Sequence, residues 1–208
     1  MESFKEWCGM LNGSELVKIA LESDAADAAI LDTASIQFYE DFRKACEKNF
    51  CRRYDTNWMG PPAIGPIQDL MQKAMRYRQG LLFQTVHAVA GNFDMKGMLA
   101  AAKIHEKVFR TLLAGIRKEF PEEEILPLNA GCCSLCEECG YLTQEPCRHP
   151  DQAVSSVEAY GINVIALQKS AGLPYYKGKE SVIYVGLILF NKAEKYGNGN
   201  AVPTDAAR

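Results

Sequence analysis

Val182-Ile-Tyr-Val-Gly-Leu-Ile-Leu-Phe190 is the stretch of the chain that decides the fold. It carries no charged residue and no alternation of polar and apolar positions, which is typical of a strand buried on both faces. A strand of this kind lies inside a sheet that other elements cover on each side. The stretch therefore favours an α/β fold.

The segments before this strand alternate between helical and extended patterns. Apolar spacing and stop signals predict a helix over Ile67–Arg78 ended by Gly80, a strand over Leu81–Ala88, a helix from an Asp94 cap to about Lys118, and a strand over Ile125–Leu128. After a cysteine-rich loop, Ser155-x-x-Glu158 has the form of a capping box that starts a helix, and Gly172 ends that helix.

The N-terminal third gives weaker patterns. Glu15–Glu22 fits a helix or a strand, a short strand is indicated near Ile36 and Phe38, and Tyr39–Lys48 fits a helix. The stretch Gly60-Pro-Pro-Ala-Ile-Gly-Pro66 must be a non-helical connection, because each proline fixes its own φ and restricts the residue before it.

This order of elements predicts an α/β fold with a small, mostly parallel sheet, because right-handed crossovers bring successive strands side by side. The cysteine-rich loop would lie between a strand and a helix, where open α/β sheets usually place ligands. We expect one domain over residues 1–208. Residues 1–66 would pack on a core formed by residues 67–190, and residues 191–208 would be a flexible tail.

Composition excludes several classes of protein. The 208 residues are 48% hydrophobic and 24% charged, with a net charge of −3, so no basic nucleic-acid-binding surface is expected. No apolar stretch is long enough to span a membrane, and no secretory signal pattern is present. We therefore expect a cytoplasmic protein, in which eight cysteines serve as metal ligands rather than as disulfides.

Five of those cysteines lie within residues 132–147. Cys133, Cys136 and Cys139 have C-x₂-C-x₂-C spacing, and Cys147 follows seven residues later. Three thiolates around one turn and a fourth from the same loop suit one 4Fe–4S cluster. The alternative is a structural zinc ion, which usually takes two separated C-x₂-C pairs. The spacing favours the cluster over zinc, and zinc over no metal.

Several neighbouring side chains have both a functional and a structural interpretation. Cys132 could be a spare ligand, a redox-active thiol or a small buried residue. Arg148 could tune a bound cluster, or lie on a solvated loop. His105 and His87 fit satisfied core histidines better than bases or ligands. Glu158 is explained by the capping box rather than by acid–base work.

The motifs resemble a cysteine-rich family of predicted metal-binding proteins that is common in anaerobes. The resemblance covers about residues 30 to 190 and rests on two sets of residues in order: Cys46-x₄-Cys51-x₂-Tyr54-x₃-Trp58 with Pro61-Pro62 and Gly80-Leu-Leu-Phe83, then Cys133, Cys136, Cys139, Pro146-Cys147-Arg-His-Pro150 and Ser156-x-Glu158-Ala-Tyr-Gly161. It implies metal or iron–sulfur binding, but no reaction.

The chain departs from that family at one position. The resemblance implies a cysteine directly before the Pro-Pro pair, where this chain has Gly60. Cys46 and Cys51 therefore lack the partner of a second metal site, unless Cys132 or Cys8 supplies it. We expect this second site to be degenerate.

Three functions remain open from the sequence. A cytoplasmic redox protein would pass single electrons between its cluster and a partner protein. A zinc module would organise a face that binds a partner or ligand without redox chemistry. An enzyme would use an open metal position, or Cys132 as a nucleophile, and ranks last because four cysteines close the metal's shell.

Overall fold

The structure is a computed structural model that describes residues 12–121 and 123–191. The predicted flexible tail, apart from Asn191, and Cys8 lie outside these residues. The described elements, in chain order, are α1 (Gly13–Glu22), β1 (Asp27–Asp32), η1 (Thr33–Ser35), α2 (Asp41–Glu47), α3 (Ile67–Met75), β2 (Gln79–Ala88), α4 (Met95–Glu119), β3 (Ile125–Asn129), η2 (Gly140–Thr143), β4 (Ser155–Ser156), η3 (Glu158–Tyr160), α5 (Val164–Ser170) and β5 (Ser181–Phe190).

The α/β class is confirmed, but the expected mostly parallel sheet is wrong. The strand order is β1-β2-β5-β3-β4, and only the short β3–β4 pair is parallel. Helix α4 does carry the chain from β2 to β3 in the same direction, as a crossover would. However, β5 enters between these two strands and runs antiparallel to both. The sequence pattern cannot reveal this insertion, because a buried central strand looks the same in either direction.

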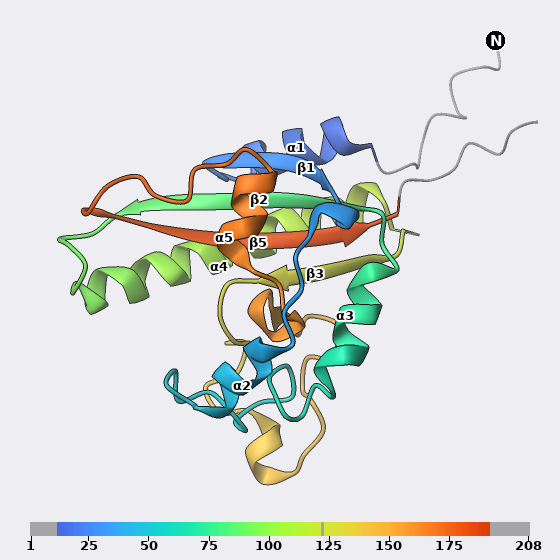
Figure 1. The fold of residues 1–208 in the computed structure, drawn as a ribbon, viewed down its shortest axis with the longest axis vertical. Coiled ribbons are helices and arrows are strands. Elements are labelled where there is room, and N and C mark those ends of the chain that lie inside the picture. Colours follow the sequence, from blue (N-terminus) through green and yellow to red (C-terminus); the bar gives the residue numbers. More distant parts are fainter. Residues whose placement is uncertain (1–11, 122, 192–208) are drawn as a thin grey trace, which may run out of the picture.

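Each face of the sheet carries its own apolar core (Figure 1). On one face, α1 and α4 pack on side chains that include Phe83, Ile188 and Phe190. On the other face, α3, η3 and α5 pack on side chains that include Leu187 and Leu189. Successive residues of β5 thus alternate between two cores, which is why this strand shows no polar positions.

The helix boundaries test the stop and start signals. Helix α4 begins where predicted, with the Asp94 carboxylate accepting from the Gly97 N–H at 2.9 Å. Helix α3 ends at Met75, and the predicted stop residue Gly80 instead lies within β2. Close packing explains why glycine occupies this position in β2. A Cβ on Gly80 would come within 2.9 Å of the Leu189 side chain.

The predicted capping box is also wrong. Ser155 and Ser156 form β4, Glu158 starts a single 3₁₀ turn, and the helix begins only after Asn163, whose side chain caps it. Pairing of Ser155 with β3 competes successfully with the local capping preference. The end of this helix is as predicted, because Gly172 has φ of +69° and donates its N–H to Lys169 in a Schellman motif.

The N-terminal third contributes to both the sheet and the region below it. Glu15–Glu22 is helical, and the first strand is Asp27–Asp32, so the strand expected near Ile36 and Phe38 is wrong. Phe38 makes only an isolated bridge to Ile162.

The segment from α2 to α3 lies below the sheet, side by side with the cysteine-rich loop that follows β3 (Figure 1). Among the described residues, no helix is long and apolar enough to cross a membrane.

Candidate metal centre

The cysteine-rich loop starts at a fixed end of β3. Asn129 is the last residue of that strand, and its carbonyl oxygen accepts the Val157 N–H at 3.0 Å. Gly131 then takes φ of +70°, a left-handed conformation that favours glycine and turns the chain out of the sheet. The predicted position of the loop after a strand is confirmed. The short strand β4 follows the loop, and not the predicted helix.

A tight turn folds the far half of the loop back on itself. The Glu145 N–H donates to the Gly140 carbonyl at 2.8 Å. A Cβ on Gly140 would meet the Pro146 and Glu145 carbonyl oxygens at 3.0 and 3.1 Å, so a larger residue would crowd this turn. The turn brings Cys147 back to the same place as Cys139.

All four predicted ligands line one small cavity. Cys133, Cys136, Cys139 and Cys147 surround a space of about 20 Å³, and each of them is partly buried. Such a volume holds about one water-sized sphere. The four cysteines that the sequence predicts as ligands therefore lie around the same cavity.

The four cysteines line this cavity but are not gathered as the ligands of one ion. Within residues 12–121 and 123–191, no three His, Cys, Asp or Glu side chains are gathered as the ligands of a single ion. Thiolates that share one zinc ion lie about 3.8 Å apart, given Zn–S bonds of about 2.3 Å and tetrahedral angles. The donor set of four thiols fits a thiolate-bound group, and binding would require the loop to adjust around it.

The N-terminal segment forms the wall opposite the loop. The Trp58 indole N–H donates to the Glu145 carbonyl at 2.9 Å, and its ring meets the Tyr141 ring edge-on at 4.9 Å. The Tyr141 hydroxyl in turn donates to the Asp55 carboxylate. The contact of Trp58 with Glu145 joins residues 87 positions apart, so the loop is held by a segment distant in the sequence.

Two arginines provide positive charge beside the thiols. Burial raises the pKa of Cys133, while N–H groups of Leu135 and Val154 and the charge of Arg110 act in the opposite direction. Arg148 lies on the solvent side, where it pairs with the Glu145 carboxylate at 2.8 Å and donates to the Glu138 carbonyl at 3.0 Å. Both guanidinium groups favour an anionic group in the cavity.

A buried polar network ties the start of the loop to α4. His105 is 1% exposed and lies between the Thr85 hydroxyl and the Asn129 side chain, at 2.9 Å from each. Asn129 donates to the Glu106 carboxylate, which also pairs with Arg110 at 2.7 Å. Desolvation lowers the pKa of His105 to about 4, so it is neutral. The interpretation of His105 as a satisfied core histidine is confirmed.

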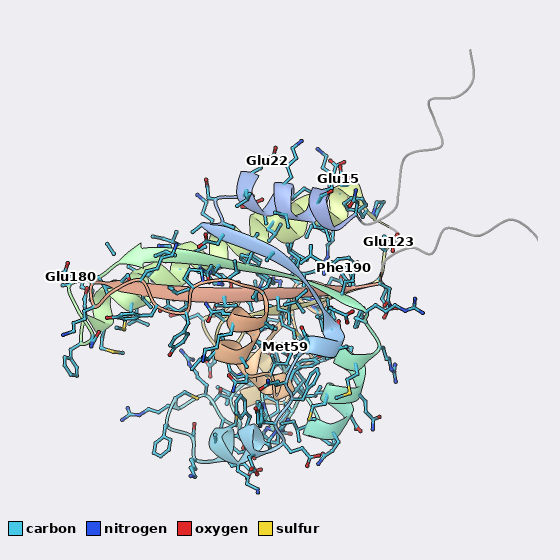
Figure 2. All side chains as sticks on the ribbon, turned by 45° about the horizontal axis from the view of Figure 1, so that its top comes forward. Glu15, Glu22, Met59, Glu123, Glu180 and Phe190 are labelled. Carbon is cyan, nitrogen blue, oxygen red and sulfur yellow. The ribbon has the colours of Figure 1, made fainter. Side chains whose placement is uncertain are left out.

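A second cavity lies on the other side of the segment that contains Asn57 and Met59. These two residues line both the first and the second cavity. Its volume is about 370 Å³. Figure 2 labels Met59 below the sheet, where side chains of the two segments meet. Its carbonyl oxygen accepts from the Ser155 hydroxyl at 2.9 Å, which fixes this dividing segment against β4.

Three cysteines line the second cavity: Cys46, Cys51 and Cys132. Sequence reasoning named Cys132 as one of two thiols that could join Cys46 and Cys51, and it lines the same cavity as they do. No local pattern could have chosen it, because Gly131 and Cys132 lie in a bend. Glu158 also lines this cavity and caps no helix. Its side chain is accessible from the cavity, but protein surrounds it on most sides, which raises its pKa.

These features define an α/β protein with a four-cysteine loop suited to a thiolate-bound metal. A family model described as "Predicted metal-binding protein (DUF2284)" matches residues 29–190, and the chain belongs to this family. No curated protein matches the chain significantly.

A solved structure, "Structure of epoxyqueuosine reductase from Streptococcus thermophilus", matches 90% of this chain and 48% of that chain. The sequence identity is 14% and the TM-score is 0.39. The chain spans about half the length of that protein. A likeness at this TM-score bears on neither the fold nor the function of this chain.

Proposed function

We propose that the protein binds one 4Fe–4S cluster through Cys133, Cys136, Cys139 and Cys147 and exchanges single electrons with a partner protein. The observation that carries this proposal is the convergence of these four cysteines on one cavity. When bound, such a cluster supplies one-electron redox chemistry at a potential that its hydrogen bonds and exposure adjust.

The arrangement of the thiols supports a cluster over a single ion. All four come from one loop of fifteen residues, Cys133–Cys147, and three of them repeat every third residue. All four line the same small cavity, and among the described residues no three of them are gathered as the ligands of a single ion. A cubane takes its four thiolates at separate corners, whereas zinc draws them to a common centre.

The surroundings suit an electron-transfer centre near the surface. The four cysteines are each partly buried, and the loop lies at the end of the molecule opposite α1 (Figure 1). Arg148 stands on the solvent side of the cysteines, with its side chain 49% exposed. A partner protein could therefore approach the cluster closely.

The cavity volume supports a second candidate, a structural zinc site. A space of about 20 Å³ accepts one ion with less movement of the loop than a cubane requires. In this case the metal would stabilise the docking of Trp58 on the loop, and the protein would be a binding module without redox chemistry.

Anaerobic reconstitution of the full chain with iron and sulfide separates these candidates. The cluster predicts about four irons and four sulfides per chain with a broad visible absorbance. Cys136→Ser should remove most of this absorbance. Cys51→Ser should leave it nearly intact, because Cys51 lines the other cavity. A colourless protein with one zinc would refute the cluster and support the structural site.

A further inference from the structure

The cavity lined by Cys46, Cys51 and Cys132 is not used by the proposed cluster. The chain brings these thiols together from three separate places: α2, the irregular segment after it, and the loop after β3. Cys132 is the direct neighbour of Cys133, which lines the other cavity. The two adjacent thiols thus serve opposite sides of the segment that contains Asn57 and Met59.

We propose that Cys46, Cys51 and Cys132 bind a second, thiophilic metal ion of the zinc class, whose fourth coordination position is open to a small molecule in this cavity. Three protein ligands with one open position are the arrangement of catalytic zinc sites, whereas four ligands close structural ones. This proposal does not depend on the cluster in the first cavity.

The lining of the cavity supplies no fourth thiol. The backbone passes at Gly60 and Gly131, neither of which has a side chain to reach the metal. Glu158 is the acidic residue of the lining, and its carboxylate already accepts from the Ser156 hydroxyl and from its own N–H. These hydrogen bonds orient Glu158 in the cavity that the three thiols also line.

The size and charge of the surroundings agree with this assignment. The volume of about 370 Å³ lies in the range of small-molecule pockets, which starts near 300 Å³. The Arg43 guanidinium acts electrostatically on Cys46, and its Nε and Nη2 atoms are buried with no hydrogen-bond partner among the described residues. Thiolates at this site would place negative charge near this guanidinium.

The three thiols must draw together to share one ion, because no such group is already gathered within the described ranges. Cys51 and Cys132 both lie in segments without helix or strand, so small backbone shifts can move them. Cys46 lies in the last turn of the short helix α2.

Cobalt titration of the metal-free, reduced full chain tests the second site. Cobalt replaces zinc and gives visible thiolate charge-transfer absorbance. The wild type should bind about two cobalt ions per chain, one for each set of thiols. The matched variants Cys132→Ser and Cys133→Ser change neighbouring residues, and each should lose a different ion, with affinity for that ion lowered at least about tenfold. The double variant should lose both ions.

Two results would overturn the second site. The first is that Cys132→Ser still binds both cobalt ions with wild-type affinity. The second is that Cys51→Ser and Cys136→Ser weaken the binding of the same cobalt ion. Circular dichroism of each variant checks that the fold is retained. Reconstitution with iron and sulfide reads out the first cavity separately, so Cys132→Ser should still form the proposed cluster. A failure of the cluster in the wild type leaves the cobalt result unaffected.

The double variant Cys136→Ser/Cys139→Ser is used to test the open coordination position of the second site. Its two substitutions disable the first site. Cyanide added to this cobalt-loaded variant should shift its visible spectrum. Adding Gly60→Cys should abolish the shift, because a fourth thiol would then fill the position, whereas Gly60→Ser should not. The atoms nearest to a Cβ at Gly60 are those at the end of the Asn57 side chain, the first at 3.0 Å. A cyanide-insensitive spectrum with Gly60 in place would refute the open position.

Discussion

Acidification should destabilise the protein through His105, the buried histidine of the network that ties α4 to the end of β3. Its pKa is about 4 in the folded protein and about 6.5 in the unfolded chain, so folding favours the neutral ring. The stability that this ring contributes is complete above pH 6.5 and is lost as the pH falls from 6.5 to 4. A shift of this size corresponds to about 3 kcal/mol in total, of which about 2 kcal/mol is lost by pH 5.

Urea unfolding of the metal-free protein at pH 7.5 and pH 5 measures this loss. His105→Gln keeps an amide in place of the ring but does not titrate, so its free energy of unfolding should fall by about 2 kcal/mol less than that of the wild type. Thr85→Val is the matched control. It removes one hydrogen bond of the ring at every pH but keeps the titration of His105. Equal pH dependence in wild type and His105→Gln would refute the assignment of a buried neutral ring.

Two further substitutions test packing and the wall of the first cavity. Gly186→Ala should lower the free energy of unfolding by about 1–3 kcal/mol in chemical denaturation, because its Cβ would lie 2.4 Å from the buried Phe83 ring. A decrease in this free energy no larger than that caused by Gly80→Ala would contradict this packing. Trp58→Phe removes the hydrogen bond to the Glu145 carbonyl, so a chelator should remove metal from the loop faster than in the wild type. An unchanged rate of metal removal would show that this wall does not hold the site.

The sequence predicted most elements of the fold but not the direction of its strands. The long helix capped by Asp94 and the buried strand over Val182–Phe190 are strong local patterns, and the structure confirms both. Strand order depends on contacts between residues about a hundred positions apart, such as Gly80 with Leu189, which no local pattern encodes. The capping box failed for a related reason, since pairing with β3 determines the conformation of Ser155.

The candidate site shows the same division between local and distant information. The spacing of Cys133, Cys136 and Cys139 is local, and the convergence of these residues with Cys147 follows from it. The placement of Cys132 with two cysteines of the N-terminal third is not local, because it depends on how the segment after α2 docks under the sheet.

The most direct test of the central claim is a determination of iron, zinc and acid-labile sulfide per chain, with a visible spectrum, on anaerobically purified protein. A 4Fe–4S cluster on the four-cysteine loop predicts about four irons and four sulfides with broad visible absorbance, and loss of these in Cys136→Ser. Iron and sulfide absent from a colourless protein, with zinc in their place, would contradict it.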